Sequence, residues 1–223
     1  MTRGIFIAGN ESVLFSSIAT EVEKRVEQYV AALIPNTFPA PEKATDFDTS
    51  KGRIPLSWNP GSPISCRTLI LAAENRLGQI NDALLVCSPP PLYRQPESMV
   101  PADIETLVNN QIKGWFFLVR ELALVFRSRG EGSLSLVVPE TAPGGGRDAP
   151  ADLMGTSASA SFRAFTQGLL ASAANEPFQI LGFSLSEIGQ EGTFASWMFK
   201  ILDEGGKKNS GKWHKYSKFT LFR

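Results

Sequence analysis

Short apolar runs recur along this chain, and a stretch with helical periodicity follows most of them. Uninterrupted apolar runs are typical of strands that are buried on both faces of a parallel sheet. We expect strands at 4–9, 30–36, 52–58, 82–88, 132–139, 178–186 and 216–222. We expect helices at 11–31, 63–78, 102–129, 152–174 and 194–204. This alternation predicts one α/β domain over residues 1–223, with a doubly wound, mostly parallel sheet of six or seven strands and helices on both faces.

The run at 30–36 allows two interpretations. Apolar residues recur at every fourth position of the first helix up to Val30, so this run can also be the end of that helix. We interpret it as a strand that starts at Ala31 or Ala32.

The charge balance limits the class of partner. The chain has 22 basic and 22 acidic residues, so its formal net charge is zero. A broad nucleic-acid surface normally shows as a basic excess, and we therefore expect no nucleic-acid partner. The run from Lys207 to the C-terminus is locally basic, but a solvated tail or a subunit contact explains it as well as RNA does.

The sequence also indicates a compartment. It has no signal-peptide core and no run of eighteen apolar residues, so we expect a cytoplasmic protein without membrane contact. Cys66 and Cys87 lie in apolar surroundings outside any CxxC pair. Buried free thiols are favoured over a disulfide, which stays possible.

Several segments, in order, resemble the short-chain dehydrogenase/reductase family over nearly the whole chain. NDALLVCSPP at 81–90 is similar to the family's fourth strand, and residues 109–138 resemble its long fifth helix and the strand after it. Residues 157–174 resemble the helix that follows the active-site tyrosine, and 209–216 resemble the closing strand. The resemblance implies a Rossmann-type fold and, in intact members, an NAD(P) cofactor.

The cofactor positions implied by the resemblance are altered. The family turn TGxxxGxG lets the backbone approach the cofactor pyrophosphate at a helix N-terminus. Gly9 matches the first of these glycines, whereas Val13 and Phe15 stand where the second and third belong, and Phe15 would fill the phosphate space. Ser88 stands in the segment that lines the adenosine. We therefore expect no bound cofactor.

The catalytic positions implied by the resemblance are altered as well. The family uses a tyrosine as general acid and a lysine four residues later that lowers its pKa. These positions fall on Gly155 and Ser159, and neither can transfer a proton in that role. Thr141 is the only hydroxyl where the family has its serine, and the asparagine of the long helix maps to Gln111. The substrate-lid segment after residue 186 is shortened.

Other candidate sites are weaker. No cluster of His, Cys and carboxylates has metal-ligand spacing, so we expect no metal. His214, the single histidine, is interpreted as a solvated or interface residue rather than a base. The glycine run at 143–150 could cradle a phosphate, but a loop left over from an active site explains it better.

The helices at 102–129 and 152–174 carry a large apolar surface, which must be buried in a core or against a partner. In the family these two helices pack against their equivalents from a second subunit. The predicted interface residues are Trp115, Phe116, Leu122, Phe126, Phe162, Phe165 and Leu169.

Three hypotheses follow. The first is a pseudoenzyme that acts as a partner subunit, in a homo-oligomer or in a hetero-oligomer with an active NAD(P)-dependent reductase of the same family. The second is a divergent NAD(P)-dependent oxidoreductase, and the third is a self-associating module that binds a ligand in the emptied pocket. Cofactor binding would favour the second, and a retained small molecule would favour the third.

Overall fold

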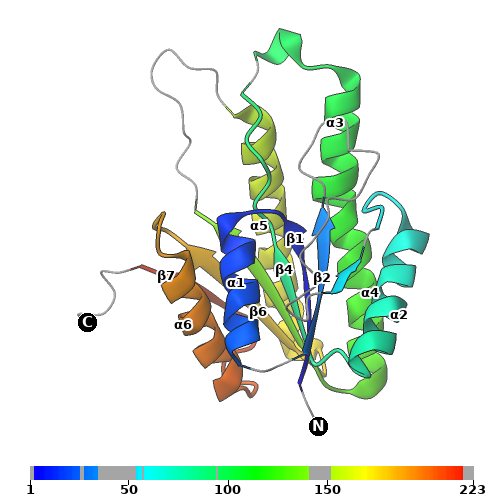
Figure 1. Ribbon diagram of the computed structural model, residues 1–223, viewed down its shortest axis with the longest axis vertical. Coiled ribbons are helices and arrows are strands. Elements are labelled where there is room, and N and C mark those ends of the chain that lie inside the picture. Colours follow the sequence, from blue (N-terminus) through cyan, green and yellow to red (C-terminus); the bar gives the residue numbers. More distant parts are fainter. Residues whose placement is uncertain are drawn as a thin grey trace.

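The computed structural model describes residues 3–25, 28–34, 54–56, 58–93, 95–140 and 152–217. Its seven strands form one parallel sheet in the order β3-β2-β1-β4-β5-β6-β7 (Figure 1). The strands are β1 (Gly4–Asn10), β2 (Gln28–Ile34), β3 (Ile54–Leu56), β4 (Asp82–Val86), β5 (Ser133–Pro139), β6 (Gln179–Leu185) and β7 (Lys212–Tyr216). The loops expected at 38–51 and 143–150 lie outside the described residues.

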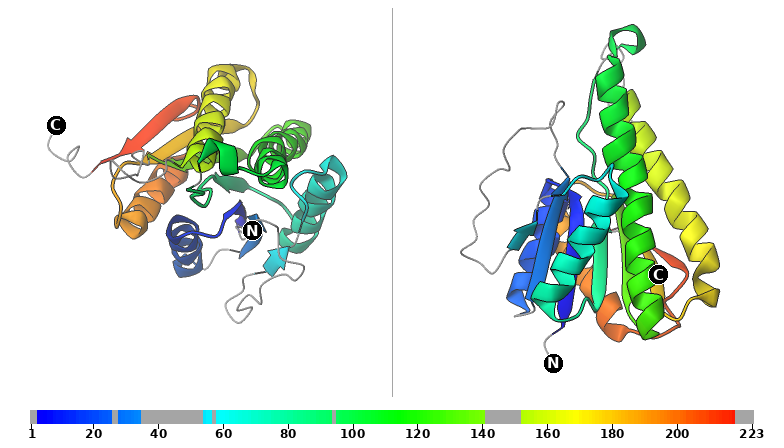
Figure 2. Two further views of the ribbon diagram at one scale, coloured as in Figure 1. Left: turned by 90° about the horizontal axis from the view of Figure 1, so that it is seen from above. Right: turned by 90° about the vertical axis from the view of Figure 1, so that its right-hand side faces the viewer.

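Helices cover both faces of this sheet, as the view from above shows (Figure 2). One face carries α1 (Val13–Lys24) and α6 (Glu191–Glu204), and the other carries α2 (Pro63–Leu77), α4 (Gly114–Arg129) and α5 (Leu153–Ser172). Chain order reverses between β1 and β4, which defines a doubly wound sheet with its switch point there. The predicted fold class is confirmed.

The two cores explain why the inner strands are mostly apolar. In β5, Leu134, Leu136 and Val138 pack toward α2, α4 and α5, whereas Val137 packs toward α1 and α6. A strand with a core on each side has no solvent face, so even its polar residues, Ser133 and Ser135, are buried.

The predicted end of the first helix is wrong. α1 ends at Lys24 and β2 begins at Gln28, so the strand starts before the expected Ala31 or Ala32. Val30 belongs to the strand, and it continued the four-residue pattern of the helix by coincidence. Periodicity alone does not separate a buried strand from a helix end.

The predicted last strand is displaced. β7 spans Lys212–Tyr216, and the expected range 216–222 begins where this strand ends; residues 218–223 lie outside the described part. Gly211, at φ +77°, turns the chain into the strand, a backbone conformation that favours glycine. This glycine marks the strand start better than the apolar residues further on.

The predicted helix 102–129 is divided into three pieces. α3 (Pro101–Leu107) leads into a π-helical turn, η3 (Val108–Lys113), and then into α4. Short 3-10 turns lie at η2 (Pro96–Ser98) and η4 (Ala173–Asn175). The right-hand view of Figure 2 shows α3 and the start of α5 projecting beyond the carboxyl end of the sheet.

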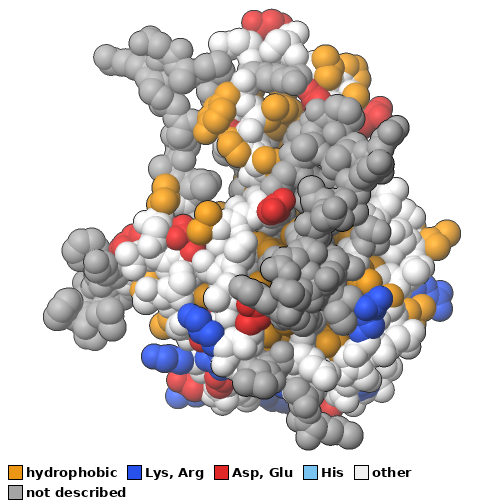
Figure 3. Space-filling model, in the orientation of Figure 1, with side chains coloured by type: hydrophobic (Ala, Val, Ile, Leu, Met, Phe, Trp, Pro, Cys, Tyr) orange, Lys and Arg blue, Asp and Glu red, His pale blue; other side chains and the backbone are white. Residues whose placement is uncertain are grey.

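Exposed hydrophobic side chains gather on this projecting part, whereas the visible Lys and Arg side chains lie over the lower half (Figure 3). The projecting part exposes Val100, Ile104 and Leu153. Within the described ranges, no helix is both long and apolar enough to cross a membrane.

Candidate functional site

The carboxyl ends of β1, β4 and β5 meet at the switch point of the sheet, where doubly wound folds bind their ligands. Most of the sequence-predicted site residues that the structure describes lie at this edge or on the helices above it. Thr141 lies outside the described residues.

Gly9 and Phe15 close the space between β1 and the start of α1. A Cβ atom at Gly9 would lie 2.4 Å from the carbonyl oxygen of Val86 and 3.0 Å from Cδ2 of Phe15. Phe15 is buried in the core, whereas Val13 is 69% exposed. An aromatic ring therefore packs where the family turn has a glycine, and the other altered position faces solvent.

The first turn of α1 uses one of its own free amides. The Oγ atom of Ser12 accepts a hydrogen bond from the backbone N–H of Phe15, at 3.1 Å. This N-cap uses an N–H group that could otherwise donate a hydrogen bond to a phosphate at the helix N-terminus.

The end of β4 continues this edge toward α4. Cys87 is fully buried, and burial raises the pKa of its thiol; Ser88 beside it is half-buried.

Gln111 projects from the π-helical turn and is 1% exposed, and its Oε1 atom has no hydrogen-bond partner among the described residues. π-Helical turns are frequent at functional sites.

The start of α5 explains the residue at the tyrosine position. Asp152 caps the helix, because its Oδ1 atom accepts hydrogen bonds from the backbone N–H groups of Gly155, at 2.9 Å, and Leu92, at 3.0 Å. A Cβ atom at Gly155 would lie 2.3 Å from Oδ2 of Asp152. A side chain at position 155 would therefore make the Asp152 carboxylate shift from this position. Ser159, one turn further on, is half-buried.

A polar cluster that the sequence did not reveal lies after β5. Glu140 accepts hydrogen bonds from Ser186 Oγ, at 2.8 Å, and Ser184 Oγ, at 3.1 Å. The Arg163 guanidinium from α5 lies 3.3 Å from its carboxylate, and the Lys215 ammonium from β7 lies 3.5 Å away. We call these five residues the Glu140 cluster.

The environment holds Glu140 in its charged form. Burial opposes the charge, but the bonds from Ser186 and Ser184 and the positive charges of Lys215 and Arg163 outweigh it and lower the pKa of the carboxyl. The cluster joins β5, β6, β7 and α5 at the carboxyl side of the sheet. The one sequence feature that could have indicated this cluster is the position of Glu140 directly after the strand predicted at 132–139.

His214 is half-buried rather than solvated. Its ring stacks on Phe183 with centroids 5.3 Å apart, and burial lowers the pKa of the imidazole.

Cys66 and Cys87 are both buried and unpaired, as predicted, and burial raises the pKa of Cys66 to about 12. The described part of the chain contains no group of three or more His, Cys, Asp or Glu that could hold a metal.

No family model matches this sequence, and no curated protein matches it. Solved structures do. A short-chain type dehydrogenase/reductase from Mycobacterium marinum matches with a TM-score of 0.74 at 12% identity, over 96% of this chain and 92% of that one. A short chain dehydrogenase from Bacillus anthracis matches with a TM-score of 0.72 at 13% identity, over 99% of this chain and 97% of that one. ElxO with NADP bound matches with a TM-score of 0.72 at 12% identity, over the whole of both chains.

The chain has a short-chain dehydrogenase/reductase fold. In this reductase fold, the connection from β6 to α6 is only residues 186–190. At identities this low the likeness establishes the fold, and the chemistry has to be argued from the residues described above.

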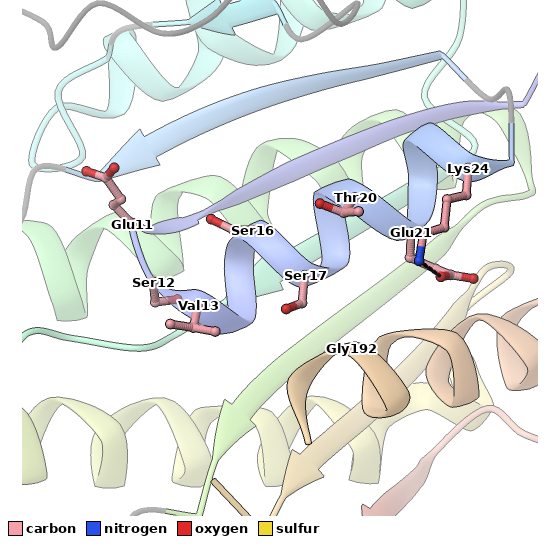
Figure 4. Close-up of a pocket in the computed structure, with 9 residues that line it drawn as sticks. All are labelled: Glu11, Ser12, Val13, Ser16, Ser17, Thr20, Glu21, Lys24 and Gly192. Carbon is pink, nitrogen blue, oxygen red and sulfur yellow. Dashed lines mark ion pairs between the residues drawn. The ribbon is translucent and has the colours of Figure 1, made fainter. Parts of the chain in front are cut away.

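A groove starts at the carboxyl edge of the sheet, at Ser12 and Val13, and follows α1 past the start of α6 at Gly192 (Figure 4). Ser17 points toward the α6 ribbon at Gly192, and further along α1 Glu21 pairs with Lys24 at 3.8 Å. Glu21 also binds Arg25 and Ser196, so its carboxylate is engaged in holding the two helices together.

The predicted interface needs correction. Trp115, Leu122, Phe126 and Phe162 are at most 1% exposed and belong to the chain's own core, so they are not available to a partner. Phe116 is 50% exposed and stacks on half-buried Phe165, with ring centroids 4.1 Å apart; Leu169 is also half-buried. The apolar circumference of the helix reflects packing against both the sheet and the neighbouring helices.

Proposed function

We propose that this chain is a non-catalytic subunit with a short-chain dehydrogenase/reductase fold, which binds an active NAD(P)-dependent reductase of the same fold through α4 and α5. The observation that carries the proposal is the contact between Asp152 and Gly155. Glycine at position 155 has no side chain, and the cap holds it at the start of α5, so this position supplies no proton donor.

The cofactor position supports the same conclusion. The Phe15 ring packs against Gly9, and Ser12 takes up the Phe15 amide. A dinucleotide needs close backbone approach and free amides at this helix N-terminus, and these residues do not fit that group. The proposal therefore includes no bound nicotinamide.

The substrate side supports it as well. In the Glu140 cluster a carboxylate is saturated by two hydroxyls and two cations, so no group there is left as an acid or base. The short connection at 186–190 offers little chain to cover a substrate. The unpaired cysteines fit a reducing compartment such as the cytoplasm.

Exposed apolar residues on α4 support a subunit contact. Phe116 and Leu124 are 50% and 48% exposed on one side of this helix. Beside them, α5 presents small residues, and a Cβ atom at Gly168 would meet nothing within 4 Å. Small residues let a second helix approach closely, and apolar ones favour its burial.

One observation favours a second candidate, a divergent NAD(P)-dependent oxidoreductase. Gln111 lies buried in a π-helical turn with its side-chain carbonyl unpartnered among the described residues, which is the arrangement of a group that awaits a ligand. ElxO, which has this fold, was solved with NADP. This candidate needs a proton donor from outside positions 155 and 159.

A hydride-transfer assay separates the two candidates. The purified chain is mixed with NADPH or NADH and a panel of ketones, enones and quinones, and cofactor oxidation is followed against an active reductase as positive control. The proposal predicts no oxidation above the protein-free rate. Turnover that scales with the concentration of this chain would overturn it.

A further inference from the structure

The exposed side of α4 alternates cations with apolar residues. We call the five side chains the basic stripe; they are Lys113, Phe116, Arg120, Leu124 and Arg127. Their spacing of three, four, four and three residues places them on one side of the helix. The exposed residues of α4 and of the neighbouring α5 include no carboxylate.

The carboxylates near the stripe lie beneath the cations. Arg120 pairs with Glu121, and Arg127 binds Glu176 at 2.8 Å; the arginine side chains are 65% and 56% exposed, whereas both glutamates are 10% exposed. Lys113 donates a hydrogen bond to the neutral side chain of Asn109, at 2.9 Å. Cations are therefore what an approaching protein meets first.

The stripe is symmetric about Arg120. In a two-fold contact, the same patch from each subunit meets the other, and two α4 helices would run antiparallel. Phe116 would then face Leu124 of the second copy, which favours association. Arg120 would face Arg120 of the copy, and Lys113 would face Arg127, which opposes it. Like charges set against each other at an interface select against that partner.

Resting on the proposed function, we infer that the partner is a different polypeptide and not a second copy. Its facing helix carries apolar residues opposite Phe116 and Leu124 and carboxylates opposite Lys113, Arg120 and Arg127. The basic stripe thus recognises an acidic and apolar helix and rejects self-association.

A charge-reversed copy of this chain serves as a model partner. It carries K113E, R120E and R127E, with E121Q and E176Q so that neither Glu121 nor Glu176 is left beside a new carboxylate. Its association with wild type is measured by sedimentation velocity at about 20 mM salt, where surface charges are little screened. The control copy carries R67E, K200E and K208E, three exposed cations outside the two helices.

The inference predicts that wild type and the charge-reversed copy each stay monomeric alone, and that their mixture forms a dimer. The mixture should bind at least about tenfold more tightly than wild type binds itself, and the gain should vanish at about 500 mM salt. The control copy should give no gain.

Two results would overturn the inference and are distinguishable. Wild type that dimerises alone as tightly as the mixture would contradict rejection of a second copy but leave the α4 and α5 interface standing. No association of the mixture, with both proteins folded, would contradict the interface as well.

If the charge-reversed copy does not fold, wild type alone provides the test. Repulsion between basic stripes predicts that self-association becomes tighter as salt rises. Self-association that weakens with salt, or ignores it, would overturn the inference.

Discussion

Asp152 and Gly155 show how one cap contact determines what a position can do. The carboxylate that satisfies the Gly155 amide of α5 lies 2.3 Å from where a Cβ at residue 155 would be, so a side chain there would displace the cap. The same logic applies at Gly9, where the Phe15 ring occupies the space beside the backbone.

The cap contact can be tested by adding one methyl group. Gly155→Ala should lower the free energy of unfolding by about 1–2 kcal/mol, because the Cβ displaces the Asp152 carboxylate from its amides. Gly168→Ala, on the same helix, is the matched control, since its Cβ meets nothing within 4 Å. It should raise the free energy of unfolding by about 0.5–1 kcal/mol. Urea denaturation measures both; equal effects would contradict the clash.

His214 predicts a pH dependence. Burial lowers its folded-state pKa, so as pH falls below about 6.5 the unfolded chain binds the proton first and stability is lost. His214→Phe should flatten the dependence of unfolding free energy on pH between about pH 7 and pH 5. The chain has one histidine, so NMR reads its titration without overlap. An unchanged slope in the variant would contradict the assignment.

At the scale of elements, the sequence predicted the order of helices and strands well, but it predicted the residues at which they begin and end poorly. Buried strands are indicated by continuous apolar runs, so the first six strands and their order along the chain could be predicted. The end of α1 could not, because Val30 extends its four-residue pattern into β2. β7 was placed too late because its residues Lys212 to Tyr216 are largely polar at an edge of the sheet.

The candidate site was predictable only in part. Matching positions to a motif located Gly9 and Gly155, but not the close contacts there, since these involve Val86 and Asp152. Glu140 was not predicted, because the resemblance implies a hydroxyl in this segment. Its partners come from three elements that only the folded sheet brings together.

The Glu140 cluster is predicted to hold α5 and β7 to the sheet. Glu140→Gln should lower the free energy of unfolding by about 1 kcal/mol at neutral pH, because the charge-assisted bonds are weakened. The lowered folded-state pKa makes this stabilisation present above about pH 4.3 and lost as pH falls through the folded value. The difference between variant and wild type should therefore shrink in acid.

Exposed Glu105 on α3 supplies the control for this prediction. Glu105→Gln should change the free energy of unfolding by less than about 0.5 kcal/mol. Equal losses in the two variants would show that the Glu140 cluster contributes nothing beyond a surface charge.

On the scale of the whole molecule, the chain has the fold of the solved short-chain dehydrogenases. Its carboxyl side carries the buried ring of Phe15, the helix cap of Asp152 and a Glu140 carboxylate that hydroxyls and cations engage. Under the proposed function, such a molecule binds another subunit and no dinucleotide.

Titration of the purified chain with NADPH and NADH, followed by calorimetry, tests this account most directly. The packing of Phe15 on Gly9 and the cap by Ser12 predict no saturable binding up to millimolar cofactor. An active reductase titrated in the same buffer shows that the measurement can detect binding. A dissociation constant in the micromolar range would contradict the account, because the dinucleotide would then have a site that these side chains do not fill.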